Sequence, residues 1–556
     1  MSAAPPASPP SSGVPSPGAV ASPPAAPSAE PSGGAERRAI VGRAGIVASG
    51  TLVSRILGLG REQVLAALFS RAETDAFITA FMIPNLLRQL LAEGAVQTSV
   101  LPVLAASRET AGDAATRDLF RRLRGLSLLL LAAASLGGVL AAPWLVGAFA
   151  GGFRQHPGQF ERTVELTRWV FPYIFFMGSA ALGLAALNTY QRYVVTAFAP
   201  ALLNVSFIAC ALCLPGALIA SGHDRVYALA IGVWLGGVLQ VVAQWPSLHR
   251  VGMLERPRLD LKHPGVRDVF RRIGPATLGI GVYYLDVMAG RHLLSELEVG
   301  ATTYFTFALR LCDFPQGIFI MALQAATLPS LARLAAKNDW VELGKTFSFG
   351  MRLSLFVAVP ATLLFVALAE PVVVLIFQRG EFDAAAAVET ARALAAQGAG
   401  IWAVAGVRQL VTTFYALGDT RTPALVSAVD FLVFLGLALV LRPSLGHVGI
   451  SWAVTGASVV QMLLLWWRLG RRRPEIETWA VLRSGTLTLL CSLPAAFAAG
   501  IVARALTRAG AGEIGRSAPA IAGSAAFVAV FLVGARLMKH KELEMSWRAL
   551  RRRRSG

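Results

Sequence analysis

The sequence predicts an all-α polytopic membrane protein. Hydrophobic residues make up 55% of the 556 residues, charged residues only 15%, and the mean hydropathy is +0.58. Soluble proteins of this length are not so apolar. Apolar runs of about 20 residues, the length of a transmembrane helix, recur along the chain. These observations indicate a bundle of many membrane-spanning helices.

About fourteen apolar runs are long enough to cross a bilayer. Residues 1–38, which precede the first run, are rich in Pro, Ala, Ser and Gly and predict a disordered cytoplasmic tail. Residues 541–556 predict a basic cytoplasmic tail. The runs begin near Ala44, Thr74, Leu126, Val164, Thr196, Val226, Ile273, Thr303, Phe349, Ala385, Thr422, Val448, Ala480 and Ser517.

The loops between the runs predict the orientation. Basic residues gather in the segments 107–125, 248–273, 331–352, 466–474 and 551–556. Alternating spans would put all five segments on one face of the membrane. Because Lys and Arg favour the cytoplasmic side, we expect both termini in the cytoplasm. The same loops account for the net charge of +19, so we expect no nucleic-acid partner.

Three proline-containing stretches occur twice in the same order. The pairs are Pro84 with Pro315, Pro102 with Pro329, and Pro200 with Pro423. Their nearly constant separation predicts two six-helix lobes, residues 39–250 and 265–472, in a parallel repeat, because an even number of spans returns the chain to the same side. Residues 478–540 add two helices outside the repeat. The alternative is chance similarity between apolar segments.

Several spans carry charged residues. In the first half they are Arg55, Arg61, Glu62, Asp75, Arg88 and Glu93. In the second half they are Asp286, Arg291, Arg310 and Asp313. A charge at the centre of a transmembrane helix costs about 2.5–3.5 kcal/mol on insertion scales, so such residues face a bundle interior or a water-filled cavity.

Two interpretations of the arginines stay open. Arg55, Arg88 and Arg310, which we place deep in their spans, form either buried ion pairs or a cationic cavity for an anion. Arg61 and Asp75 lie nearer to span ends, where a long side chain can reach the interface. Arginine suits a phosphate because its planar fork donates two hydrogen bonds. Prolines beside these arginines supply bending points for alternating access.

Four stretches have a more specific pattern than apolarity alone. They are SRILGLGREQVLAALF, TDAFITAFMIPNLLRQLLAEGAVQTSVLPVLA, ALNTYQRYVVTAFAPALLNVSFI and FYALGDTRTPALVSA. They resemble the MurJ/MviN family of lipid II flippases, within the multidrug/oligosaccharidyl-lipid/polysaccharide exporter superfamily. The resemblance runs in order from about residue 40 to 540. PNLLRxLxAEGA is its most specific element.

The resemblance implies a V-shaped pair of lobes that carries lipid II, the undecaprenyl-diphosphate-linked disaccharide-pentapeptide, from the inner to the outer leaflet of the bacterial inner membrane. It implies a groove for the lipid tail beside the two helices of 478–540, and partners among membrane lipids and cell-wall synthesis enzymes. The arginines that it assigns to substrate binding are Arg55, Arg61, Arg88 and Arg310. As gating residues or charge partners we expect Asp75, Asn85, Glu93 and Asp313.

The chain departs from the family pattern in its second half. Leu309 stands where many relatives have an acid before the arginine of the eighth span, and Gly290 stands before Arg291 where relatives often have Asp. An ion site in the C-terminal lobe of some relatives is therefore altered here. Asp286 and Asp430 are the acids that could hold a coupling ion instead. We expect no cofactor and no metal cluster.

Other functions remain alternatives. An arginine cavity would recognise the diphosphate of another polyprenyl-linked glycan as well. A drug-cation exporter needs an acid-rich cavity, which this chain does not predict. A membrane glycosyltransferase or phosphatase needs an acid–base pair or a metal cluster, whereas the histidines mostly stand singly in loops. A static pore is disfavoured because helix breakers occur at matching places in both halves.

Overall fold

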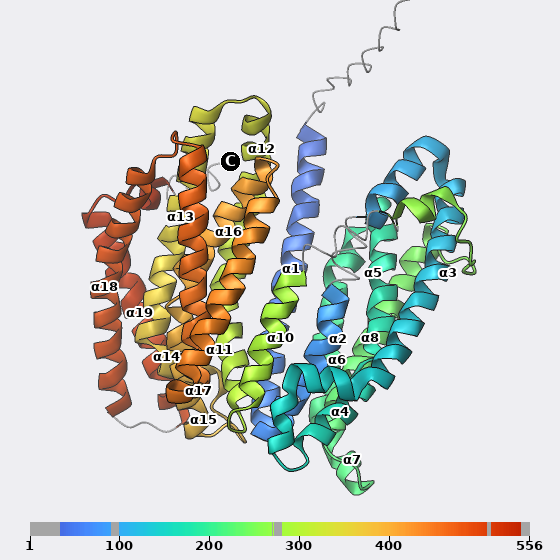
Figure 1. Cartoon of the computed structure of the whole chain (residues 1–556), viewed down its shortest axis with the longest axis horizontal. Coiled ribbons are helices and arrows are strands. Elements are labelled where there is room, and N and C mark those ends of the chain that lie inside the picture. The colour runs from blue at the N-terminus through green and yellow to red at the C-terminus, as the bar shows by residue number, and fades with distance from the viewer. Residues whose placement is uncertain (1–33, 90–98, 270, 272–280, 509–512, 546–556) are drawn as a thin grey trace, which may run out of the picture.

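The computed structural model describes residues 34–89, 99–269, 271, 281–508 and 513–545 (Figure 1). Every regular element in these ranges is helical, which confirms the predicted all-α fold. The first half contains α1 (Gly34–Leu68), α2 (Arg71–Arg88), α3 (Leu101–Ala150), the short 3₁₀ helix η2 (Gly151–Gln155), α4 (Gln159–Val170), α5 (Tyr173–Thr189), α6 (Tyr193–Cys213), α7 (Pro215–Ala220) and α8 (Tyr227–Arg250).

The second half begins with α10 (Gly281–Ser295) and α11 (Ala301–Pro315), which a π-helical turn η3 (Gln316–Ile320) joins to α12 (Met321–Ala336). It continues with α13 (Trp340–Ala367), α14 (Ala369–Phe377), α15 (Ala384–Gly398), α16 (Ile401–Ala416), α17 (Arg421–Arg472), α18 (Thr478–Arg508) and α19 (Glu513–Leu537). We call α1–α8 the N-lobe and α10–α17 the C-lobe. Figure 1 shows the lobes side by side, with α1 of the N-lobe and α10 of the C-lobe in the middle of the view.

Two long helices are hairpins. Gly446 inside α17 has a φ of 58°, and Gly112 inside α3 has a φ of 79°, a region open to glycine because it has no Cβ. The Gln461 side chain donates to Ser427 Oγ at 3.1 Å, although a straight helix would hold these residues about 50 Å apart. The chain therefore reverses at Gly446, between the spans predicted at Thr422 and Val448.

The lobes repeat one packing order. In the N-lobe α1 packs on α6, α2 on α4 and α3 on α5, whereas in the C-lobe α10 packs on α17, α11 on α15 and α13 on α16. The matched prolines occupy equivalent helices, with Pro84 in α2 and Pro315 in α11, and Pro200 in α6 and Pro423 in α17. This order supports the parallel repeat, whose superposition stays a prediction. Outside it, α18 and α19 pack on each other and on the C-lobe.

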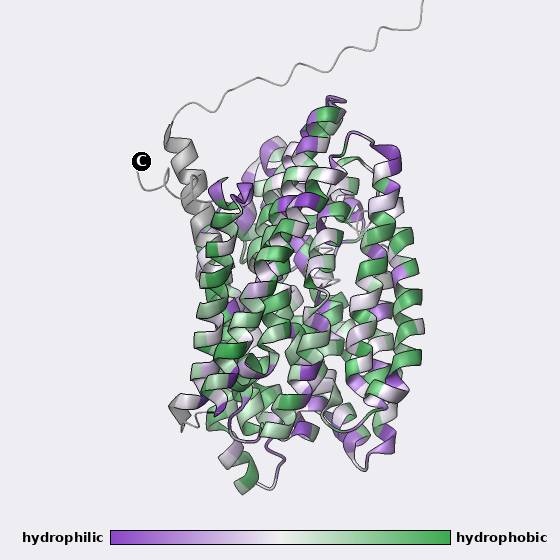
Figure 2. Cartoon of the chain, turned by 90° about the vertical axis from the view of Figure 1, so that its left-hand side faces the viewer, coloured by the Kyte–Doolittle hydropathy of each residue, from purple (hydrophilic) through white to green (hydrophobic). Residues whose placement is uncertain are grey.

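The bundle has two distinct ends. The upper end in Figure 1 holds the reversal inside α3, the segment after α8 and the turn between α12 and α13, and the lower end holds α7 and the reversal inside α17. Figure 2 shows hydrophobic residues along the length of the bundle and hydrophilic residues concentrated towards both ends. The basic loop segments within the described residues lie at the upper end, as alternation of the spans predicts.

The number of spans is not settled by helix length alone. Within the described residues, 8 helical segments are long and apolar enough to cross a membrane. Helices such as α2, with 18 residues and several charges, are shorter or more polar. The predicted spans begin inside helices, except that Val226 directly precedes α8 and Ile273 lies outside the described residues. The count of fourteen stays a prediction.

The lobes share a hydrophobic core only over part of their length. The largest buried cluster contains Leu65, Phe69 and Phe77 of the N-lobe together with Phe307 and Phe377 of the C-lobe. The last two rings stack with their centroids 4.6 Å apart. At the upper end each lobe has a separate cluster, around Phe120 in one and Phe347 in the other. The lobes are therefore joined at the lower end.

Candidate functional site

Three adjoining pockets lie between the lobes. Their volumes are about 670, 420 and 60 Å³. Arg61 of α1 and Arg310 of α11 line all three, so the pockets form one chamber with these two guanidinium groups at its centre. The predicted arginines flank them, because Arg88 lines the largest pocket and Arg55 the second.

Glu62 holds the central arginines. Its carboxylate accepts a hydrogen bond from Arg61 at 2.6 Å and lies 3.8 Å from Nε of Arg310. The Glu62 side chain is 7% exposed, whereas that of Arg310 is 48% exposed. Arg61 also lies over the rings of Phe81 and Phe207, at 5.9 and 5.6 Å from their centroids. Arg61 is thus fixed in place, whereas about half of the Arg310 side chain is open to the chamber.

Arg88 and Arg55 are positioned by local contacts. Nε of Arg88 donates to the Asn85 side-chain oxygen at 2.9 Å, one helical turn earlier on α2. Arg55 lies against the π-helical turn of the C-lobe, where its guanidinium occupies the space beside Gly317, and it contacts the Met321 sulfur at 3.9 Å. A side chain at Gly317 would therefore require the flexible Arg55 side chain to move aside.

The second pocket also contains charges from the C-lobe. Asp313 lies on α11 and is close enough to interact electrostatically with Arg310, Arg408 and Arg55. Arg408 of α16 was not among the predicted site residues. Its sequence signal is an arginine inside the apolar run IWAVAGVRQLVTTF, without a motif around it. Asp313 therefore lies near three arginines of the chamber, and its role as a charge partner stays a prediction.

Arg291 is a further cation of the chamber. It lines the smallest pocket, donates to the Thr306 hydroxyl at 2.6 Å and lies over the ring of Phe305. Among the described lining residues of the three pockets, the cations are Arg55, Arg61, Arg88, Arg291, Arg310 and Arg408, and the anions are Glu62 and Asp313. The chamber is net cationic, which suits an anion with several oxygen atoms.

Asp75 does not face the chamber. It is 1% exposed, and it accepts hydrogen bonds from the backbone N–H of Gly300 at 2.6 Å and of Thr303 at 2.8 Å. The Thr303 hydroxyl also donates to it at 2.5 Å. These groups belong to the first turn of α11, where backbone donors are otherwise unsatisfied. Asp75 of the N-lobe therefore caps a helix of the C-lobe.

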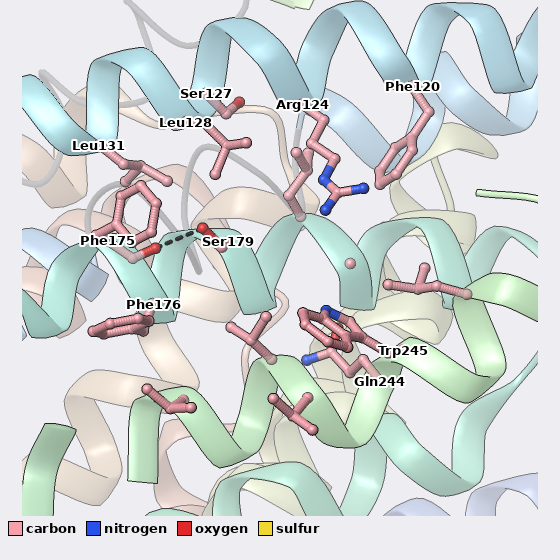
Figure 3. Close-up of a pocket in the computed structure, with 16 residues that line it drawn as sticks. Phe120, Arg124, Ser127, Leu128, Leu131, Phe175, Phe176, Ser179, Gln244 and Trp245 are labelled. Atoms are coloured by element: carbon pink, nitrogen blue, oxygen red, sulfur yellow. Dashed lines mark hydrogen bonds between the residues drawn. The ribbon is translucent and has the colours of Figure 1, made fainter. Parts of the chain in front are cut away.

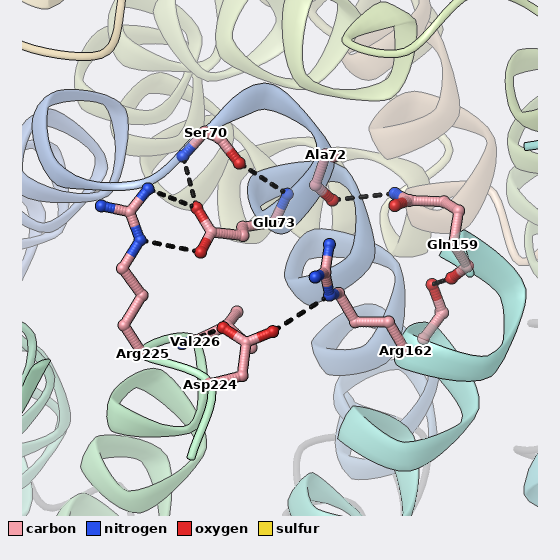
Figure 4. A network of polar contacts seen from close by, with 9 residues as sticks. Ser70, Ala72, Glu73, Gln159, Arg162, Asp224, Arg225 and Val226 are labelled. Atoms are coloured by element: carbon pink, nitrogen blue, oxygen red, sulfur yellow. Dashed lines mark hydrogen bonds and ion pairs between the residues drawn. The ribbon is translucent and has the colours of Figure 1, made fainter. Parts of the chain in front are cut away.

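Polar contacts join the lobes near Asp75. Figure 4 shows Arg225 forming a two-pronged ion pair with Glu73, at 2.8 and 2.9 Å, which the Ser70 N–H also supports. Arg225 reaches Glu381 of the C-lobe at 3.4 Å, and the Glu381 N–H donates to the Ala67 carbonyl at 3.0 Å. The lower end is thus closed by hydrogen bonds as well as by the shared apolar core.

Asp286 and Asp430 lie together in the C-lobe. Asp286 is on α10 and Asp430 on α17, and the two carboxyl groups are close enough to interact electrostatically. Gly290 and Phe434, which lie four residues further along α10 and α17, pack against each other. Asp286 and Asp430 therefore lie at the same height in the bundle. One oxygen of each carboxyl has no hydrogen-bond partner among the described residues. No group of three metal-ligating residues occurs in the described ranges.

One predicted site residue cannot be placed. Glu93 lies in the segment 90–98, outside the described residues. The structure thus brings Arg55, Arg61, Arg88, Arg310 and Asp313 to one chamber. It puts Asn85 at the chamber wall, Asp75 at the lower closure and the Asp286–Asp430 pair inside the C-lobe.

The chain is similar to proteins of one family. The family model described as "Lipid II flippase MurJ" matches residues 64–515. The lipid II flippase MurJ of Burkholderia cenocepacia is 36% identical over 439 residues, which are 77% of this chain and 84% of that protein. The probable lipid II flippase MurJ of Vibrio cholerae is 32% identical over 76% of this chain and 81% of that protein.

Solved structures show the same fold. A structure described as lipid II flippase MurJ in an inward closed conformation has a TM-score of 0.72 at 17% identity and covers 89% of this chain and 99% of that one. An inward-facing multidrug resistance MATE transporter of the MOP superfamily has a TM-score of 0.63 at 13% identity, over 75% and 94% of the two chains. At these identities the likeness concerns the fold alone.

Proposed function

The chain belongs to the MurJ family of lipid II flippases, and we propose that it moves lipid II from the inner to the outer leaflet of the bacterial inner membrane by alternating access. The observation that carries the proposal is the chamber around Arg61 and Arg310, with its excess of arginines over acids. A diphosphate offers several anionic oxygens, and arginine forks match them with paired hydrogen bonds.

Arg310 and Arg88 are the groups that we assign to the diphosphate. Arg310 is the more exposed of the two central cations, and Arg88 extends the charge into the largest pocket. Glu62 keeps Arg61 and Arg310 in place while the chamber is empty and competes with the substrate for them. Because a bound anion must also leave, such competition favours turnover over tight retention.

The lower closure is the gate in this proposal. Opening the chamber towards the lower end requires the hydrogen bonds of Asp75 to α11 and the Arg225–Glu381 contact to break. Each contact contributes only about 1–3 kcal/mol, so binding of the substrate and of a coupling ion can shift the balance between the two states. The start of α1, the end of α19 and the described basic loops are at the upper end, which is then the cytoplasmic side.

The pair Asp286 and Asp430 is our proposed ion site. Asp286 and Asp430 are half-buried, and one buried oxygen of each has no partner among the described residues, which is costly unless a proton or a cation compensates it. A monovalent cation bound by both acids would hold α10 and α17 together at this height. We propose that ion binding at this site is coupled to transport. We also propose that cell-wall synthesis enzymes dock on the protein.

A second candidate function is export of another polyprenyl-diphosphate-linked glycan. The arginines of the chamber contact the diphosphate, which all such lipids share, so they favour neither substrate. The family favours lipid II.

Complementation with matched arginine variants tests the proposal. A bacterium depleted of its lipid II flippase is supplied with the wild-type chain, with Arg310→Ala or Arg88→Ala, or with Arg392→Ala, which removes an exposed cation on α15 outside the chamber. We expect growth with the wild type and Arg392→Ala and none with the other two, at equal protein abundance. Growth with both chamber variants would refute the cationic mechanism.

A further inference from the structure

An apolar pocket lies in the N-lobe, away from the chamber between the lobes. It has a volume of about 330 Å³ and lies between α3, α5 and α8. Figure 3 shows Leu131, Phe175 and Phe176 around one part of it, and Arg124, Gln244 and Trp245 around another. Trp245 is 46% exposed and Val242 is 42% exposed, so the pocket opens on the outer surface of the bundle. Nothing in the proposed transport cycle uses it.

The charged group and the amide of the pocket are at its upper part. Arg124 lies on α3, twelve residues after the turn at Gly112, and Gln244 lies on α8, six residues before the helix ends at Arg250. Leu131 and Phe175 are further from these turns, towards the middle of the bundle. One part of the pocket is therefore cationic and polar, and the other is mostly hydrocarbon, with the Ser179 hydroxyl donating to the Phe175 carbonyl at 2.6 Å.

Gln244 is a buried donor without a partner. Its residue is 1% exposed, and its Nε2 has no hydrogen-bond partner among the described residues. Its Oε1 lies in the space that a side chain at Gly183 would occupy, which holds the amide at the pocket wall. An unpaired amide in an apolar site costs about 1–3 kcal/mol, so a bound acceptor would remove this penalty.

The Arg124 guanidinium has more N–H groups than are needed for the hydrogen bond that it donates within the protein. One of its nitrogens donates to the Glu255 carbonyl at 3.4 Å, and a guanidinium has five N–H groups. A cation and an amide donor above a hydrocarbon-lined pocket match an amphiphile with an anionic head and an acyl chain. Basic pockets between transmembrane helices bind anionic lipid headgroups in this way. Tryptophan is enriched at the depth of the lipid headgroups, so Trp245 fits such a site.

We infer that this pocket, which we call the lipid pocket, binds an anionic glycerophospholipid of the upper leaflet. Its phosphate contacts Arg124 and Gln244, and one acyl chain lies against Leu131, Phe175 and Phe176. This inference does not rest on the proposed transport function.

The lipid pocket shares a wall with the chamber. Gln240, one turn before Gln244 on α8, lines the largest chamber pocket, and Ala181 and Leu184 of α5 do so beside Leu182 and Gly183 of the lipid pocket. A lipid held there packs against the same two helices that the substrate touches. Its occupancy therefore affects the stability of the chamber wall.

Quenching of Trp245 by brominated lipids tests the site. The purified full chain in detergent is titrated with phosphatidylglycerol or phosphatidylcholine, each brominated in its acyl chains. We expect phosphatidylglycerol to quench the fluorescence at about fivefold lower concentration, the effect of one cation near a lipid headgroup. Trp245→Phe should remove this difference, because the other tryptophans do not line the pocket.

Three variants assign the contacts. Arg124→Gln should abolish the preference for phosphatidylglycerol, and Val241→Phe, which fills the pocket without changing charge, should abolish quenching of Trp245 by either lipid. Arg121→Gln, a cation one turn away that does not line the pocket, should leave the preference intact. Equal quenching by both lipids, or equal effects of the two arginine variants, would overturn the inference. Displacement by undecaprenyl phosphate but not by unbrominated phosphatidylglycerol would show a substrate-tail site instead.

Discussion

Asp75 of the N-lobe accepts two hydrogen bonds from Thr303 of the C-lobe, from the backbone N–H at 2.8 Å and from the hydroxyl at 2.5 Å. Together with the Gly300 N–H at 2.6 Å, these bonds cap α11. The partial positive charge of a helix N-terminus favours an anion there. A single carboxylate thus joins the two lobes at the lower end of the bundle.

Replacing Asp75 should weaken the lower closure. Asp75→Asn keeps the shape but loses the charge, and helix-cap substitutions cost about 1 kcal/mol. We expect the lower end to open several-fold more often and complementation to fail. Disulfide cross-linking between cysteines introduced at Arg71 and Asp383, which pair across the lobes, measures the closure.

The cross-linking yield should fall in Asp75→Asn and stay unchanged in Asp113→Asn. Asp113 is an exposed acid at the upper end that pairs with Arg108 within the N-lobe. An unchanged yield in Asp75→Asn would contradict the capping role in gating.

Neutralising Glu62 should strengthen substrate binding and slow its release. Glu62→Gln removes the competitor of the substrate for Arg61 and Arg310. We expect the affinity for a diphosphate lipid to rise about fivefold, since a neighbouring charge at 4 Å contributes about 1 kcal/mol or more. Binding to the purified protein and transport in vesicles measure the two effects. Weaker binding in Glu62→Gln would show that the carboxylate only positions the arginines.

The turn between α16 and α17 should resist acid. Burial by itself would raise the pKa of Asp419, but hydrogen bonds from the Thr422 N–H and hydroxyl and the contact with Arg472 lower it to about 2. An acid with a depressed pKa stabilises the fold above its unfolded value near 3.8, and this contribution disappears as the pH falls towards 2.

Asp419→Ala should therefore lower the melting temperature by the same amount at pH 7 and pH 5, through the loss of a cap-like contact of about 1 kcal/mol. The difference from the wild type should shrink only below about pH 4. A difference that stays constant down to pH 2 would show that the carboxylate has an ordinary pKa.

The orientation can be tested by labelling single cysteines in intact cells. In a background that lacks the four native cysteines, a cysteine at His223 should react with a membrane-impermeant maleimide from outside, because the lower end is periplasmic in our proposal. A cysteine at Ala114, near the turn at Gly112, should react only after permeabilisation. The reverse pattern would invert the predicted topology.

The acid pair in the C-lobe should respond to cations. Asp286→Asn and Asp430→Asn each halve the charge that faces the proposed ion. We expect sodium chloride to raise the melting temperature of the wild type above its value in choline chloride, and either variant to lose this increase. Glu342→Gln, an exposed acid on α13, serves as the control. If sodium still raises the melting temperature of both variants, the ion binds elsewhere in the protein.

The sequence by itself determined the class of the protein and much of the site. Apolar runs specify helices that span a bilayer, because a backbone in hydrocarbon must satisfy its own hydrogen bonds. The cost of an arginine in such a helix made Arg55, Arg88 and Arg310 candidates for a cavity. Their family motif indicated lipid II, and the structure brings them to one chamber.

Only the tertiary structure decided which charges meet. Arg408 stands in an apolar run without a motif, and only the packing of α16 beside η3 and α12 brings it to Asp313 and Arg55. The sequence predicts Asp75 as a gating residue or charge partner near a span end, and only the packing shows that it caps α11, which lies more than 200 residues further along the chain. Local sequence sets the helix and its apolar face, whereas contacts between distant helices depend on how those faces pack, and that decides the partner of each buried charge.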